Sequence, residues 1–87
     1  MLLIDEMISE LRTGELGLCL ISMGGASFLG RVDSEQDAER LARKVGGEML
    51  SKFDPVFVLH RRNDGEGWSA GTEVVARFDR HGVRVND

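Results

Sequence analysis

The chain has 87 residues with a net charge of −4, and 41% of the residues are hydrophobic while 30% are charged. This balance is typical of one folded domain, excludes extensive disorder, and argues against general affinity for a phosphate backbone. The single cysteine, Cys19, excludes an internal disulfide framework and a cysteine-based metal site. We therefore predict one domain over residues 1–87.

The same features bear on the cellular location. One buried thiol suits a reducing compartment. The first ten residues have no positively charged region and carry acids at positions 5 and 6, unlike a secretory signal peptide. No run approaches the length needed to span a membrane. The sequence therefore predicts a cytoplasmic protein with no membrane partner.

The first predicted element is a short amphipathic helix over residues 2–13. Arg12 in its last turn complements the helix dipole, and Gly14 suits the position after its C-terminus. Its apolar face consists of Leu3, Ile4, Met7, Ile8 and Leu11. A helix this short is marginal alone, so we expect that face to pack on its own domain, on a second copy or on a partner.

A strand hairpin is predicted next. Residues 15–23 are nearly all apolar on both faces, as in a central strand covered on both sides. Gly24-Gly25 then predicts a two-residue turn into a second strand over residues 26–32. A phosphate-binding loop is excluded because a strand, and not a helix, follows the glycines. The expected register pairs Met23 with Ala26, Ile21 with Phe28 and Cys19 with Gly30.

The clearest signal is a long helix from Ser34 to about Phe53. Ser34 and Asp37 are the two ends of a capping box, and Asp54-Pro55 ends the helix because the residue before proline avoids the α region. Gly46-Gly47 either breaks the helix or permits a close approach, expected to be that of the sheet. A continuous or kinked helix is favoured because the apolar stripe keeps its phase beyond the glycines. The stripe consists of Ala38, Leu41, Ala42, Val45, Met49 and Phe53.

The remainder of the chain predicts three strands. Residues 55–62 alternate as a strand does, with proline at the start where it is tolerated. A glycine-rich loop over residues 63–71 contains the only tryptophan, Trp68. Thr72 to Asp79 is the next strand, and His81-Gly82 predicts a tight turn into a last strand over residues 83–85. The expected pairs across that turn are Phe78 with Val85 and Asp79 with Arg84.

Together these elements predict an α+β fold with the order α-β-β-α-β-β-β. An antiparallel sheet of about five strands carries the long helix on one face, and the short helix precedes the sheet. The predicted core consists of Leu16, Leu18, Ile21, Phe28, Leu41, Val45, Met49, Phe57, Leu59, Val74 and Phe78.

No residue pattern predicts catalysis. His60 and His81 share no metal-ligand spacing with each other or with Cys19. Most carboxylate pairs fall on exposed helical faces, whereas a catalytic pair needs a closed and partly dry cleft. We therefore expect no enzymatic activity, no metal site and no cofactor.

A non-catalytic protein-binding module is the favoured function. The acidic surplus lies in residues 1–50, where nine acidic and five basic side chains sum to −4, and we assign it to the two predicted helices. An acidic surface attracts a partner protein with a basic surface. Such a module would be a small inhibitor or regulator that occupies a nucleic-acid-binding site on its partner, as phage- or plasmid-encoded inhibitors do as a class. The predicted contact residues are Glu6, Glu10, Asp37, Glu48 and, as a loop anchor, Trp68.

The alternative function is nucleic-acid binding by basic side chains of the sheet and loops. The candidates are His60, Arg61, Arg62, Arg77 and Arg84. Base stacking needs exposed aromatic side chains, but the chain has no tyrosine and its strand phenylalanines fit core positions. Self-association into a homodimer or larger homo-oligomer is a separate hypothesis, motivated by the apolar N-terminal helix and by unpaired strand edges.

Overall fold

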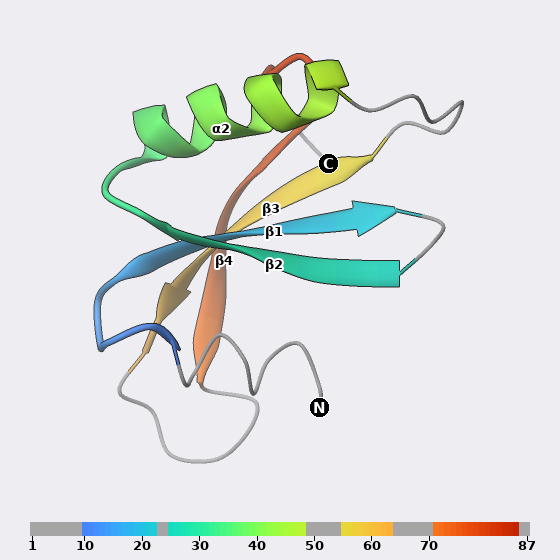
Figure 1. Ribbon diagram of the computed structural model, residues 1–87. Helices are drawn as coiled ribbons and strands as arrows, with labels where there is room; N and C mark the ends of the chain where they lie inside the picture. Colours follow the sequence, from blue (N-terminus) through green and yellow to red (C-terminus); the bar gives the residue numbers. More distant parts are fainter. Residues whose placement is uncertain (1–9, 23–24, 49–54, 64–70, 86–87) are drawn as a thin grey trace.

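The computed structural model describes residues 10–22, 25–48, 55–63 and 71–85 of the chain. Within these residues, four strands form one antiparallel sheet in the order β2-β1-β3-β4, and helix α2 lies across one face of that sheet (Figure 1). The elements are β1 (Leu16–Ser22), β2 (Gly25–Val32), α2 (Glu35–Glu48), β3 (Val56–Arg62) and β4 (Thr72–Phe78). The predicted class, an α+β fold with one helix on an antiparallel sheet, is confirmed.

Several predictions fall outside the described residues. They are the short N-terminal helix up to residue 9, the Gly24 part of the first turn, the last turns of the long helix with Met49 and Phe53, and most of the loop that contains Trp68. Among the described residues of that predicted helix only Glu10 is helical, so the helix does not extend to residue 13 as predicted. Gly14 instead lies in a turn, where it has a φ of +87°.

The first hairpin forms, but its predicted register is wrong. Ser22 pairs with Gly25, so the connection consists of residues 23 and 24, and Ile21 lies opposite Ala26 instead of Phe28. A bulge between Phe28 and Gly30 then shifts the pairing by one residue. Phe28 and Leu29 point to opposite faces of the sheet, as successive strand residues do, and each packs against a core cluster.

The turn after β4 is built by one carboxylate. Oδ1 of Asp79 accepts hydrogen bonds from the backbone N–H groups of His81 (2.8 Å) and Val83 (3.0 Å). The N–H of Gly82 donates to the carbonyl of Asp79 (3.0 Å), and Gly82 has a φ of +77° that favours glycine. The predicted turn at this point is therefore confirmed.

The strand predicted after that turn is wrong, because among the described residues 83–85 only a single bridge forms. Phe78 lies opposite Arg84 instead of Val85, so the register differs by one residue from the prediction. With the Asp79 carboxylate engaged in the turn, the Arg84 guanidinium binds Glu35 at the start of α2 (3.1 Å) instead. The described sheet accordingly has four strands and not five.

Helix α2 begins where the sequence predicts. The N–H of Asp37 donates to Oγ of Ser34 (3.1 Å), which is the expected N-cap bond. The helix then continues without a break through Gly46 and Gly47 to Glu48, so the prediction of a continuous helix is confirmed over the described residues.

The two glycines of α2 have different surroundings. A Cβ built on Gly46 would lie 2.2 Å from the carbonyl oxygen of Arg80, whereas a Cβ on Gly47 would meet nothing within 4 Å. The turn after β4 also approaches α2 closely at Gly82, where a Cβ would lie 2.9 Å from the carbonyl oxygen of Glu39. The close approach inferred from the glycine pair therefore exists, but it involves the turn after β4 and not the sheet.

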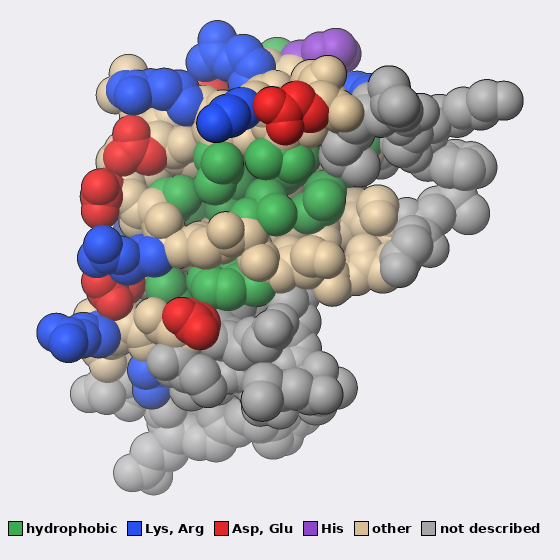
Figure 2. All heavy atoms as spheres, viewed as in Figure 1, with side chains coloured by type: hydrophobic (Ala, Val, Ile, Leu, Met, Phe, Trp, Pro, Cys, Tyr) green, Lys and Arg blue, Asp and Glu red, His purple; other side chains and the backbone are tan. Residues whose placement is uncertain are grey.

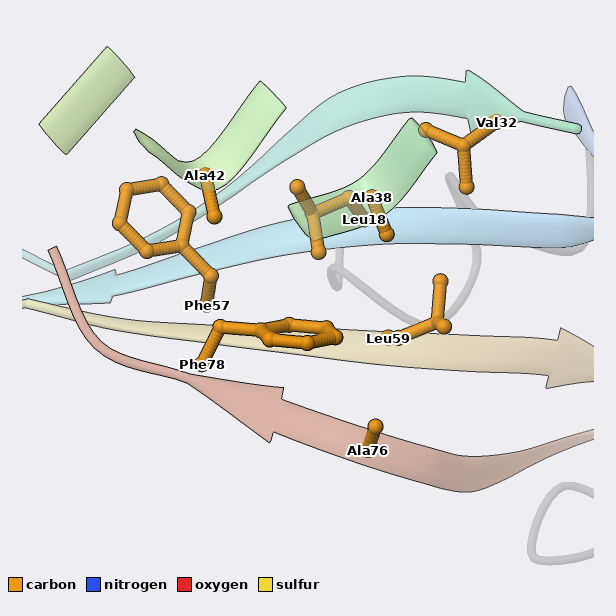
Figure 3. Packing of buried hydrophobic residues seen from close by; sticks show 8 residues of the cluster. All are labelled: Leu18, Val32, Ala38, Ala42, Phe57, Leu59, Ala76 and Phe78. Carbon is orange, nitrogen blue, oxygen red and sulfur yellow. The ribbon is translucent and has the colours of Figure 1, made fainter. Parts of the chain in front are cut away.

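The main core fills the space between α2 and the sheet (Figure 3). Its buried members are Leu18, Val32, Ala38, Ala42, Phe57, Leu59, Ala76 and Phe78. Four of the predicted core residues are thus buried, and Leu16, Leu41 and Val45 pack against them while half-buried. The prediction is wrong for Ile21 and Val74, which are 43% and 46% exposed, because both lie on the sheet face away from α2.

A second, smaller cluster lies on that other face. Leu11 and Cys19 are buried there, and half-buried Phe28 packs against them. Gly17 makes room for this packing, since a Cβ at that position would lie 2.6 Å from the ring of Phe28 and 2.9 Å from Leu11. The thiol of Cys19 is buried, as expected.

The contrast between the two glycines of α2 gives a matched test of the close contact. We expect Gly46→Ala to lower the free energy of unfolding by about 1–3 kcal/mol, because the new methyl group overlaps the backbone of Arg80. Gly47→Ala should leave it unchanged or raise it by about 0.5–1 kcal/mol, because alanine is the better helix former. Urea unfolding followed by circular dichroism measures both values, and equal stability of the two variants would contradict the described contact.

Candidate functional site

The two long sides of α2 have different neighbours. The side that carries Glu39 and Arg43 faces the turn after β4, as shown by the contacts that a Cβ on Gly82 would make with both residues. At 100° per residue, Leu41 and Val45 fall on the opposite side of the helix. Since β4 and β2 are the two edges of the sheet, this second side faces β2.

Apolar side chains remain partly exposed between α2 and β2. Leu41 and Val45 from α2, and Leu29 from β2, are half-buried and pack on the main core. We call these three residues the α2/β2 strip. Figure 2 shows hydrophobic side chains gathered in this region, between the charged surface of α2 and the backbone of β2. The strip is therefore an apolar surface that adjoins an edge of the sheet.

The two edges of the sheet differ in how they are covered. Along β4, the N–H of Val85 donates to the carbonyl of Arg77 (2.8 Å), and Arg84 forms a bridge with Phe78. Along β2, no segment among the described residues pairs with the outer side, and residues 25–27 are exposed. Exposed edge strands offer unpaired backbone groups to another chain, and charges usually protect them. The first half of β2, GASF, carries no charge.

Two of the predicted acidic contact residues lie beside the strip. Asp37 and Glu48 are within about 40° of Leu41 around the axis of α2, so they border the strip on its helix side. Arg40 and Lys44 lie further round toward solvent, and the Arg40 guanidinium is 3.8 Å from the Asp37 carboxylate. With four acidic and three basic residues, α2 is nearly balanced in charge, so the acidic surplus assigned to the two predicted helices is not a property of this helix as a whole.

The other predicted contact residues are not brought to the same surface. Glu10 is exposed and precedes Leu11, which packs on the sheet face away from α2. Glu6 and Trp68 lie outside the described residues. The structure therefore places Asp37 and Glu48 on one side of α2, about 16 Å apart along its axis, and places Glu10 elsewhere.

The basic residues of the alternative function divide between different places. Arg61 pairs with Glu73 (3.4 Å), and Arg84 pairs with Glu35. The Arg62 guanidinium donates to the carbonyl of Leu11. His60 and Arg77 lie on the sheet face away from α2, because they are in register with residues of that face. The five side chains do not converge on one open basic face.

His60 adds little positive charge near neutral pH. The ring is half-buried, with Nδ1 3.5 Å from Oγ1 of Thr72. Burial lowers the pKa of His60, and the nearby Arg77 guanidinium lowers it further. A neutral imidazole is therefore favoured at pH 7, which weakens the electrostatic basis of phosphate binding on this face.

A shallow depression of about 240 Å³ lies where β1 begins and β2 ends. Two carboxylates and two guanidinium groups line it, so it has no surplus of either charge. The Arg31 guanidinium binds Glu15 at 2.8 Å. A backbone hydrogen bond from Arg12 and the bond from Arg31 both lower the pKa of Glu15. The lining residues are Gly14, Glu15, Leu16, Arg31, Val32, Asp33 and Arg61.

In the part of the chain that the structure describes, no group of three or more His, Cys, Asp or Glu side chains is placed to hold a metal ion. No described helix is long and apolar enough to cross a membrane. No protein family, curated protein or solved structure matches the chain. Sequence reasoning missed the α2/β2 strip, because the order of the strands could not be read from local patterns.

The Glu15–Arg31 contact has a pH-dependent consequence. Because the folded pKa of Glu15 is lowered, the stabilisation from its ionised form is complete well above about pH 4.3 and is lost as the pH falls through the folded pKa. We expect Arg31→Gln to move the Glu15 titration partly back toward the ordinary glutamate value, since the Arg12 N–H bond remains. Carboxyl-carbon NMR titration measures the midpoint.

The control for this titration is Arg40→Gln, which removes a guanidinium that binds Asp37 instead of Glu15. It should leave the Glu15 midpoint where it is in the wild-type chain. If Arg31→Gln behaves like the control, the described ion pair does not exist in solution.

Proposed function

We propose that the chain is a non-catalytic protein-binding module whose partner docks on the α2/β2 strip. The observation that carries the proposal is the β2 edge, with which no described segment pairs on its outer side, beside partly exposed apolar side chains of α2. Apolar surface that adjoins unpaired backbone groups is a recurring binding arrangement, since one region supplies both buried area and hydrogen bonds.

The carboxylates bordering the strip give the partner its expected charge. Asp37 and Glu48 lie on the strip side of α2, and the whole chain carries −4. A partner with lysine or arginine beside its apolar contact would be attracted and oriented by these groups. Salt should therefore slow its association more than it changes its dissociation.

A narrower form of the proposal assigns the partner to the nucleic-acid-binding proteins. The chain would then inhibit or regulate that partner by occupying its basic site. This form is supported by the net charge and by the position of Asp37 and Glu48, and it adds Glu6 and Glu10 as further contacts. Nucleic-acid binding by the chain itself has weaker support, because the basic side chains are divided between faces and several bind carboxylates or backbone of the chain.

Affinity capture from lysate of the native host tests the proposal with one matched pair of variants. Glu48→Lys reverses a charge beside the strip, and Glu39→Lys makes the same change on the other side of α2. We expect the Glu39→Lys variant to retain a stoichiometric protein partner and the Glu48→Lys variant to lose about tenfold or more in affinity at low salt. Leu41→Gln should also weaken binding, because it removes apolar area from the strip.

Each capture is run with and without nuclease, and circular dichroism confirms that the variants fold. A partner that survives nuclease and depends on residues 41 and 48 agrees with the proposal. Loss of the signal on nuclease treatment, or equal capture by the two charge variants, would reject the α2/β2 strip as the binding surface.

A further inference from the structure

The direction of the backbone groups along β2 follows from the hydrogen bonds of β1. The N–H of Arg62 in β3 donates to the carbonyl of Glu15 (2.9 Å), so the Glu15 carbonyl points to β3. In an antiparallel sheet the residues of a central strand alternate between the two neighbours. Leu20 and Ser22 of β1, which are an odd number of residues from Glu15, therefore direct their backbone groups to β2.

The same alternation identifies the groups that point away from the sheet. Ser27 lies opposite Leu20 and Gly25 lies opposite Ser22, so both hydrogen-bond to β1. Ala26 and Phe28 are the alternate residues, and their N–H and C=O groups point to the open side of β2. An added strand can form a pair of backbone hydrogen bonds with each of two edge residues that are two positions apart.

The side chains of β2 leave room for such a strand. On the face toward α2, the positions near the hairpin end are Gly25 and Ser27, which are small and exposed. Leu41 and Val45 of α2 border this face on the same side. A side chain of an added strand that pointed toward α2 would lie beside these apolar groups, and larger aliphatic residues would bury more area than small ones.

A second copy of the chain fits this edge less well than a partner of different sequence. In the symmetric antiparallel arrangement centred on Ser27, Ala26 of one copy would pair with Phe28 of the other, and serine would lie opposite serine on the α2 side. The strip would then receive a small polar side chain. The symmetry would also bring the Asp37 and Glu48 borders of two α2 helices toward each other, whereas a basic partner would be attracted to both.

We infer that β2 binds an extended segment of a partner protein by strand addition, through the outward backbone groups of Ala26 and Phe28. The segment carries aliphatic side chains at alternate positions, which face Leu41 and Val45, and a lysine or arginine that reaches the carboxylates bordering the strip. This inference rests on the proposed function and adds the mode of binding and the chemistry of the partner.

A phage-displayed library of random twelve-residue peptides, selected against the full chain, tests this mode. We expect enriched peptides with alternating aliphatic residues and at least one basic residue. Ala26→Pro should weaken their binding about tenfold or more, because it removes an outward N–H and obstructs the added strand. Ala26→Ser keeps the N–H and is the matched control, which should bind as the wild-type chain does.

Hydrogen exchange on the wild-type chain gives a second readout that does not depend on the folding of a proline variant. In the free chain, the Ser27 amide should be protected and the amides of Ala26 and Phe28 should exchange quickly. An enriched peptide should protect Ala26 and Phe28. Unchanged exchange at both amides in the bound state would overturn strand addition.

The remaining outcomes separate this inference from the proposed function. Peptides that bind Ala26→Pro normally but fail with Leu41→Gln would overturn strand addition while the α2/β2 strip remained a binding surface. A library that yields no binder would overturn the inference. A wild-type dimer in sedimentation that becomes monomeric with Ala26→Pro would assign the edge to a second copy and would likewise overturn it.

Discussion

The close approach of α2 to the rest of the chain is the constraint on which the other features depend. Ala38, Ala42 and Gly46 recur every four residues along one line of the helix, and all three are buried. Small side chains on this line let the helix backbone lie near the sheet and against the turn after β4. The rotation of α2 about its own axis is thereby determined, and with it the residues that each side of the helix presents.

Because of that rotation, the two long sides of α2 have different surroundings. On one side, the turn built by Asp79 packs on α2 and leads the chain back along β4. On the other side, Leu41 and Val45 extend past the core toward β2 and stay partly exposed. Arg84 connects the C-terminal segment to the start of α2, since its guanidinium binds Glu35 in the first turn of the helix. The same packing that stabilises the covered side therefore leaves the opposite side available.

Local signals in the sequence were sufficient to predict where the helix and strands lie. They were insufficient to predict the register in which the strands pair. The cap at Ser34 and the phase of the α2 stripe depend on residues three and four apart, so they could be read directly. Both hairpin registers differ from expectation. In the first hairpin, Ser22 pairs with Gly25, so the connection lies one residue earlier than predicted and the opposite residues differ by two. In the second, the Asp79 carboxylate holds the turn and the pairing differs by one residue. Asp37 and Glu48 were identified by charge alone, and their position beside β2 depends on a strand order that no local pattern encodes.

The unequal coverage of the two sheet edges also bears on how the sheet could be extended by another chain. A chain that binds through β2 presents, on its far side, an edge strand whose last residues are already paired with Arg84 and Val85. A further strand could then not pair with that end of β4 without displacing the C-terminal segment. The short segment, which contributes only one bridge to the sheet, thus restricts how another chain could extend the sheet at β4.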